Sequence, residues 1–198
     1  MKKLIIASNN ENKAQELKAI FSCLDYDILT LKEAGCVIDA QELGKTFKEI
    51  ALNKAMQYYL AMGIPCISDD SGLCIDAFDG FPGIMSKRFA GANRSDENRN
   101  DIIIDTLHKH DLTQSPASYH AAMAYYSKDI HFVVEGVCQG VIKDKKSGSN
   151  GFSYDPIFWY KGRTFADMTE EEKNEVSHRG IASRLMIEKL KEINKWKN

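Results

Sequence analysis

The hydrophobic pattern of the chain changes its period from segment to segment. Short apolar runs and alternating segments predict buried strands, and two such segments flank Ser127-Lys128-Asp129 as in a hairpin. The predicted strands cover residues 3–8, 27–31, 66–68, 73–77, 119–126, 131–142 and 157–160.

Helices are predicted where apolar residues recur three or four positions apart. The clearest helix begins at Thr46, which can cap its first turn, and ends before Gly63 and Pro65. Another starts at Thr169, with Glu172 at the spacing of a capping box. The predicted helices cover residues 12–21, 46–62, 96–108, 169–176 and 177–195.

Strands and helices alternate in the first part of the chain, and hairpin-like strands follow. This order predicts an α/β protein with a mixed sheet. The chain has 198 residues, of which 43% are hydrophobic, and this is enough for a sizeable core. We find no repeat, no low-complexity segment and no clear linker in the sequence.

The composition argues against several classes of protein. A formal net charge of −2 gives no strong positive field for a nucleic-acid backbone. No apolar run approaches membrane-spanning length, and the run from Leu4 to Ala7 is too short for a signal peptide. The five cysteines are odd in number and lack C-x-x-C spacing, so we expect a reduced, intracellular protein without a structural zinc site.

A strand-to-helix turn at Ser8-Asn9-Asn10-Glu11-Asn12-Lys13 is the first candidate site. The amides of a helix N-terminus together with one lysine suit a phosphate group. An ordinary polar turn with a solvated lysine explains the same residues, so both interpretations stay open.

Residues 39–46 end like a phosphate-binding P-loop. The motif requires glycine where Asp39 stands, and the carboxylate of Glu42 would face the phosphates. We therefore do not predict a P-loop, and we consider Glu42 as a loop carboxylate available for other chemistry.

Asp69-Asp70-Ser71-Gly72 follows a short apolar strand. Neighbouring side chains on a strand point to opposite faces, so the two carboxylates should serve different purposes. Magnesium typically takes one or two carboxylates together with substrate phosphate oxygens. A turn rich in aspartate is the alternative, and the position after a buried strand favours the functional interpretation.

Two later motifs are weak when each is taken alone. In Gly151 to Pro156, Phe152 and Tyr154 could stack on a base and Asp155 could bond its edge, although such aromatics more often lie in a core. Ser177-His178-Arg179 starts a helix and could bind an anion, or simply cap it. His108 and His110 lie on different helix faces, so we expect no metal pair there.

Taken in order, these blocks resemble the inosine triphosphate pyrophosphatase family, the bacterial dITP/XTP pyrophosphatases. The blocks run nearly from end to end, and an ordered series is far more specific than any single block. The matching residues are Ser8-Asn9-Asn10 with Lys13, Glu42-Leu43-Gly44 with Thr46-Phe47, Lys54-Ala55, Ser68 to Leu73, Phe81-Pro82-Gly83 with Ser86 and Arg88, Gly151 to Phe158, Glu172-Lys173, and Ser177-His178-Arg179.

The resemblance implies a two-lobed α/β fold with a long mixed sheet and a central substrate cleft, as one catalytic domain over residues 1–198. It implies a cytoplasmic homodimer that uses Mg²⁺ to hydrolyse ITP, dITP and XTP to the monophosphate and pyrophosphate, without nucleic-acid or membrane partners. Glu42 and Asp70 would hold the magnesium, and Asp70 would also activate water. The implied substrate-binding residues are Ser8, Asn9, Asn10, Glu11, Asn12, Lys13, Lys54, Ser71, Arg88, Phe152, Ser153, Tyr154, Asp155, Lys173, His178 and Arg179.

The chain departs from the family pattern at three positions. Ile50 replaces a common asparagine, Gln41 replaces an acidic residue of some bacterial members, and Ser153 replaces the usual glycine. Because Phe152 and Tyr154 fit a strand pattern, we expect Ser153 to have an ordinary φ. A nucleotide sensor without turnover and another nucleotide phosphatase are the rival functions, which turnover and the released product would distinguish.

Overall fold

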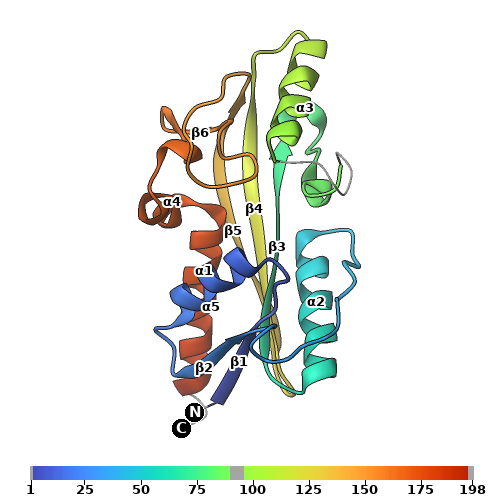
Figure 1. Cartoon of the computed structure of the whole chain (residues 1–198), viewed down its shortest axis with the longest axis vertical. Helices are drawn as coiled ribbons and strands as arrows, with labels where there is room; N and C mark the ends of the chain where they lie inside the picture. The colour runs from blue at the N-terminus through green and yellow to red at the C-terminus, as the bar shows by residue number, and fades with distance from the viewer. Residues whose placement is uncertain (1, 90–95, 196–198) are drawn as a thin grey trace. The chain divides into compact units, whose positions relative to one another are not determined.

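The computed structural model describes residues 2–89 and 96–195, apart from the side chain of Asn12. Within these residues, hydrogen bonds join seven strands in the order β2-β1-β3-β4-β5-β6-β7 (Figure 1). The strands are β1 (Lys2–Ile6), β2 (Tyr26–Thr30), β3 (Cys66–Ile75), β4 (Gln114–Tyr126), β5 (His131–Lys143), β6 (Phe158–Tyr160) and β7 (Arg163–Thr164). Parallel pairing of β1 with β2 and β3, and antiparallel pairing of β6 with β5 and β7, confirm the predicted mixed sheet.

The helices lie close to their predicted positions because their end signals are local. Thr46 accepts a hydrogen bond from the amide of Glu49, and Gly63 ends the same helix at φ 65°. Thr169 and Glu172 form the predicted capping box. The helices are α1 (Glu11–Phe21), α2 (Phe47–Met62), α3 (Asp96–Lys109), α4 (Glu170–Val176) and α5 (His178–Lys195).

Strand β3 is continuous, whereas two strands separated by Asp69-Asp70-Ser71-Gly72 were expected. The backbone stays extended from Cys66 to Ile75, and Gly72 within it has no positive φ. The aspartate-rich turn considered as an alternative is therefore wrong. Asp69 and Asp70 are adjacent residues in the middle of a strand.

The chain divides into two compact units. The first contains Met1–Asp70, Ala121–Gly136 and Ile181–Asn198, and the second contains Ser71–His120 and Val137–Gly180. Strands β3, β4 and β5 and helix α5 therefore each contribute residues to both units.

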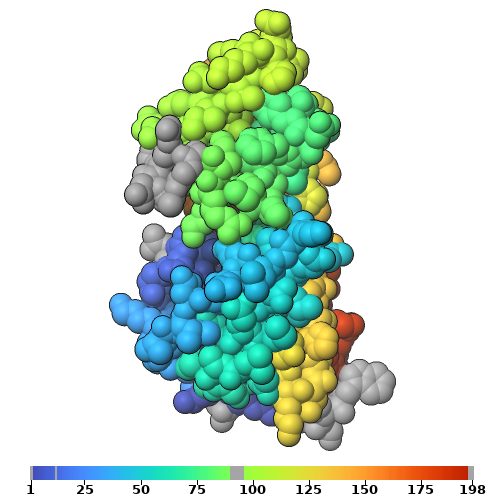
Figure 2. All heavy atoms as spheres, turned by 90° about the vertical axis from the view of Figure 1, so that its right-hand side faces the viewer, coloured from blue at the N-terminus to red at the C-terminus, as the bar shows by residue number. Residues whose placement is uncertain are grey.

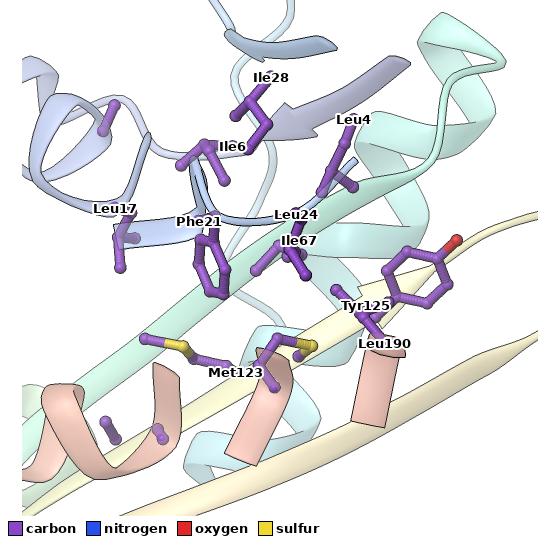
Figure 3. Close-up of a cluster of buried hydrophobic side chains, with 14 residues drawn as sticks. Leu4, Ile6, Leu17, Phe21, Leu24, Ile28, Ile67, Met123, Tyr125 and Leu190 are labelled. Atoms are coloured by element: carbon purple, nitrogen blue, oxygen red, sulfur yellow. The ribbon is translucent and has the colours of Figure 1, made fainter. Parts of the chain in front are cut away.

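The first unit has apolar clusters on both faces of β1. Leu4 and Ile6 pack in one cluster with side chains of α1, β4 and α5, which Figure 3 shows. Ile5 lies in another cluster with Tyr58 of α2. This alternation is the period-two pattern of a strand that is buried on both sides.

The second unit has a core of its own, which includes Tyr119, Tyr154, Phe158 and Phe165. Among the residues that the structure describes, no helix is long and apolar enough to cross a membrane. All five cysteines are free thiols, as the sequence predicts.

Candidate active site

The turn between β1 and α1 is organised by its own polar side chains. Asn10 caps α1, because its Oδ1 accepts a hydrogen bond from the amide of Lys13 at 3.1 Å. The Ser8 hydroxyl accepts the amide of Asn10 at 3.3 Å. Glu11 is exposed and accepts a hydrogen bond from Gln15, while the side chain of Asn12 lies outside the described residues.

Lys13 is not a solvated surface lysine. Its side chain is only 17% exposed, and its ammonium group forms an ion pair with the buried carboxylate of Asp69. The alternative interpretation of this turn, in which the lysine is solvated, is therefore wrong for Lys13. Its cation is fixed at the start of α1, where phosphate binding was predicted.

The loop before α2 is tied to this turn. Asn9 donates a hydrogen bond to Asp39, and the Tyr58 hydroxyl donates to Asn9 at 3.3 Å. The loop itself is largely exposed, as Figure 2 shows for this part of the first unit, and Leu43 is 54% exposed. Next to Leu43, the Glu42 side chain is 28% exposed and lies 3.8 Å from the ammonium group of Lys54.

The two aspartates of β3 have different surroundings. Asp69 is buried at 1% exposure, pairs with Lys13, and accepts a hydrogen bond from Lys54 at its backbone oxygen at 2.8 Å. Asp70 is less buried, and among the described residues its Oδ2 has no hydrogen-bond partner although that atom is buried.

Burial raises the pKa of the Asp70 carboxyl to about 7; Lys54 opposes this shift, while Asp69 and Glu42 add to it. The ionised form is therefore disfavoured unless a further cation lies nearby. This is the situation in which a divalent cation would fit, and its oxygen ligands would come from Asp70 and Glu42.

No group of three or more histidine, cysteine, aspartate or glutamate side chains forms a metal site within residues 2–89 and 96–195. A cation held by Asp70 and Glu42 would therefore complete its coordination with water and substrate phosphate oxygens. Magnesium commonly binds in this way, so the residues present fit this ion.

In metal-free protein, we expect Asp70→Asn to raise the free energy of unfolding at pH 8 by about 2–4 kcal/mol. The folded-state pKa of Asp70, about 7, lies above the ordinary aspartate value of 3.8. Its favourable contribution is therefore present at low pH and is lost as the pH rises toward 7. Urea denaturation with a chelator at pH 8 and near pH 4 checks this, and an equal difference at both pH values would contradict it.

The Gly151 to Pro156 segment is a turn, and two expectations fail there. Ser153 has φ 60°, so the predicted ordinary φ is wrong. Phe152 and Tyr154 do not continue a strand, because the Phe152 amide bonds the Asp155 carboxylate at 2.8 Å and the Asp155 amide bonds the Phe152 oxygen at 3.3 Å. These bonds close a turn and leave Ser153 in the left-handed region.

Residues far away in the sequence hold this turn. The Ser153 amide donates to the Asp96 carboxylate at 2.8 Å, and its carbonyl oxygen accepts from the Asn100 side chain at 3.0 Å. The Tyr154 amide donates to the Tyr119 hydroxyl at 3.2 Å. The sequence analysis missed these three partners. For Asn100 a signal existed, since its spacing places a polar residue on the apolar helix face of Ile103 and Leu107.

Phe152 is the aromatic side chain in this turn that can receive a base. Phe152 is 44% exposed, and the cations of Lys173 and Arg179 lie 4.6 Å and 5.3 Å from the centre of its ring. Tyr154 is buried in the core and donates to the oxygen of Ser86, so a stacking role for it is not supported. Asp155 is buried and bound to Lys173, so its carboxylate supports the turn.

The start of α5 is also buried. The Ser177 hydroxyl accepts the Gly180 amide at 3.1 Å and so caps the helix. His178 is 4% exposed, and its ring stacks on Tyr119 with centres 4.4 Å apart, so it is not a surface residue. Arg179 is 3% exposed. The second unit thus gathers Phe152, Lys173, His178 and Arg179 around Tyr119 and the turn.

Ser71 and Arg88 are two further predicted site residues. Ser71 follows Asp70 on β3 and is half-buried. Arg88 is exposed, and its guanidinium makes a long 3.5 Å contact with the oxygen of Ile84.

Replacing Ser153 with glycine is expected to raise the free energy of unfolding by about 0.5–1 kcal/mol, because a left-handed φ is unfavourable for serine and not for glycine. Urea denaturation measures this. The matched control is Ser149→Gly, because Ser149 lies nearby and has no positive φ; there, glycine should lower stability. An equal decrease in the free energy of unfolding in both variants would show that the backbone at Ser153 is unstrained.

Three comparisons relate the chain to known proteins. The model of the Ham1 family matches residues 4–189. The dITP/XTP pyrophosphatase of Pectobacterium atrosepticum is 41% identical, over 96% of this chain and 99% of that protein, and that of Clostridium perfringens is 40% identical over 98% and 100%. A HAM1 protein structure from Coxiella burnetii superposes with a TM-score of 0.90 and 34% identity over 97% of this chain and 100% of that one.

Proposed function

Since the chain belongs to the Ham1 family, we propose that it hydrolyses purine nucleoside triphosphates carrying hypoxanthine or xanthine to the monophosphate and pyrophosphate. The relatives named dITP/XTP pyrophosphatases support this substrate class. The observation that supports this reaction is the raised pKa of the Asp70 carboxyl group. Lys54, Lys13 and two other carboxylates lie around this group.

The phosphate chemistry belongs to the first unit. Glu42 and Asp70 would hold magnesium, and a bound magnesium ion supplies positive charge to the phosphate oxygens. Lys13 and the start of α1 would bind phosphate oxygens. Asp70 would also take the proton of the attacking water.

Base recognition belongs to the second unit. Phe152 would stack on the purine, and a donor such as the Arg179 guanidinium would face the 6-oxo group of hypoxanthine or xanthine. Adenine presents an amino group at that position, so two donors would oppose each other. Guanine shares the 6-oxo group and must be rejected at its 2-amino group. We infer that the 2-position would face a donor or water and not an acceptor, which would also accommodate the oxygen of xanthine.

We also propose that the protein forms a homodimer and works in the cytoplasm. The five free thiols fit a reducing compartment. Sedimentation at several protein concentrations would test the dimer.

A panel of nucleoside triphosphates with product identification tests the function. We expect kcat/KM for ITP, dITP and XTP to exceed the values for ATP and GTP by about 10²-fold or more, because a mismatched base leaves buried polar groups unpaired. The released product should be pyrophosphate. Values within a few-fold across all five substrates would contradict the specificity, release of orthophosphate would favour another phosphatase, and binding without turnover would favour a sensor.

A further inference from the structure

The backbone of the Phe152–Asp155 turn is held by hydrogen bonds at each of its four amides. The amides of Phe152 and Asp155 bond within the turn, and that of Tyr154 bonds Tyr119. Both backbone polar groups of Ser153 bond helix α3. Its amide donates to Asp96, and its carbonyl oxygen accepts from Asn100.

Both α3 partners are well placed to keep Ser153 in its unusual conformation. Asp96 and Asn100 are four residues apart, so they lie on the same side of the helix. Asn100 is 3% exposed, and Arg99 pairs with the second oxygen of Asp96. An L-amino acid resists the left-handed region, so the φ of 60° at Ser153 needs such outside support.

The orientation of the Phe152 ring depends on this support. Phe152 is 44% exposed, so the core does not enclose its side chain, and the largely buried cations of Lys173 and Arg179 contact the ring. Where the ring meets these cations depends on the backbone of the turn, which sets the direction of the Cα–Cβ bond of Phe152. A platform that is already oriented binds a planar base with a smaller loss of conformational entropy.

We propose that Asp96 and Asn100 are positioning residues for base recognition: by holding Ser153 in the left-handed conformation, they orient Phe152 for a purine base. This inference rests on the proposed function. It adds two specificity-supporting residues on α3 that contact the turn rather than the substrate.

The test compares Asp96→Ala and Asn100→Ala with the unaltered protein in ITP hydrolysis. We expect KM to rise about tenfold in each variant, which is the scale of one lost hydrogen bond to a rigid site. The kcat value should stay within about threefold, since the phosphate and metal residues of the first unit are unchanged. Asp96→Asn keeps an acceptor for the Ser153 amide and should restore most of the KM.

The matched control is Asp101→Ala, which removes a carboxylate from the same helix and breaks an exposed ion pair with Lys146. It should leave KM unchanged. An unchanged KM in both α3 variants, a loss of kcat without a change in KM, or an equal effect of Asp101→Ala would overturn the inference. Thermal unfolding shows whether each variant is folded. The Asp96 side chain is 41% exposed, so Asp96→Ala can still be measured if Asn100→Ala fails to fold.

Calorimetric binding of the product IMP separates the two hypotheses. If the unaltered protein releases no pyrophosphate from ITP, the proposed function fails. Weaker IMP binding by the α3 variants would still support the positioning role, and equal IMP binding would refute it.

Discussion

Asp70→Asn is expected to lower kcat for ITP by about 10²–10⁴-fold, the usual contribution of a general base. Asparagine has nearly the same size as aspartate, but it neither accepts the proton of the attacking water nor contributes a negative charge to a cation. Pyrophosphate release at saturating ITP and magnesium measures the effect.

Glu42→Gln is the informative comparison for Asp70→Asn. Glu42 lies on a partly exposed loop and its side chain is 28% exposed, so its loss should mainly raise the magnesium concentration required for half-maximal rate. As a control, Asp76→Asn at an exposed position should change neither kcat nor the magnesium requirement. If Asp70→Asn retains near-normal turnover at saturating magnesium, Asp70 is not the base.

Gly180→Ala is expected to lower the free energy of unfolding by about 3 kcal/mol or more, because the new methyl group collides with backbone. A Cβ atom at Gly180 would lie 1.7 Å from the oxygen of Asn174 and 2.7 Å from its carbonyl carbon. Backbone atoms at the end of α4 move only if the junction with α5 moves. Since His178 and Arg179 directly precede Gly180, KM for ITP should rise as well.

Urea denaturation with Gly162→Ala as a control separates collision from conformational strain. Gly162 has φ 91°, and a Cβ atom there meets nothing within 4 Å. Alanine at this position should therefore cost only about 1–2 kcal/mol from the unfavourable φ. A loss at Gly180 no larger than that at Gly162 would show that the α4–α5 junction adapts.

Local signals made much of the fold predictable. Thr46 and Gly63 fix the ends of α2 through bonds to residues a few positions away, so the sequence alone identifies them. The continuity of β3 was not predictable in this way. Gly72 permits a turn without requiring one, and whether the chain turns there depends on pairing with strands that are distant in sequence.

The candidate site also combines features that local motifs predict with features that depend on residues distant in sequence. The residue types at Lys13, Asp70 and Lys173 were found from their motifs, but their partners were not. The conformation of Ser153 is fixed by Asp96 and Asn100, which precede it by 57 and 53 residues, and no local pattern encodes such a bond. An alternating pattern also could not show that the Phe152 ring is exposed and the Tyr154 ring buried.

The division of the chain into two units has a consequence for synthesis on the ribosome. The first unit contains both the first strand and most of the last helix, and Leu4 and Ile6 share a core with Met186 and Leu190 (Figure 3). While the chain is being made, the apolar faces of β1 and α1 have to wait for α5 to emerge. During this interval they are exposed to aggregation and to proteases. A stop codon before α5 would therefore remove Ala182, Met186 and Leu190 from the core around β1 and α1, even though the loss lies at the opposite end of the chain.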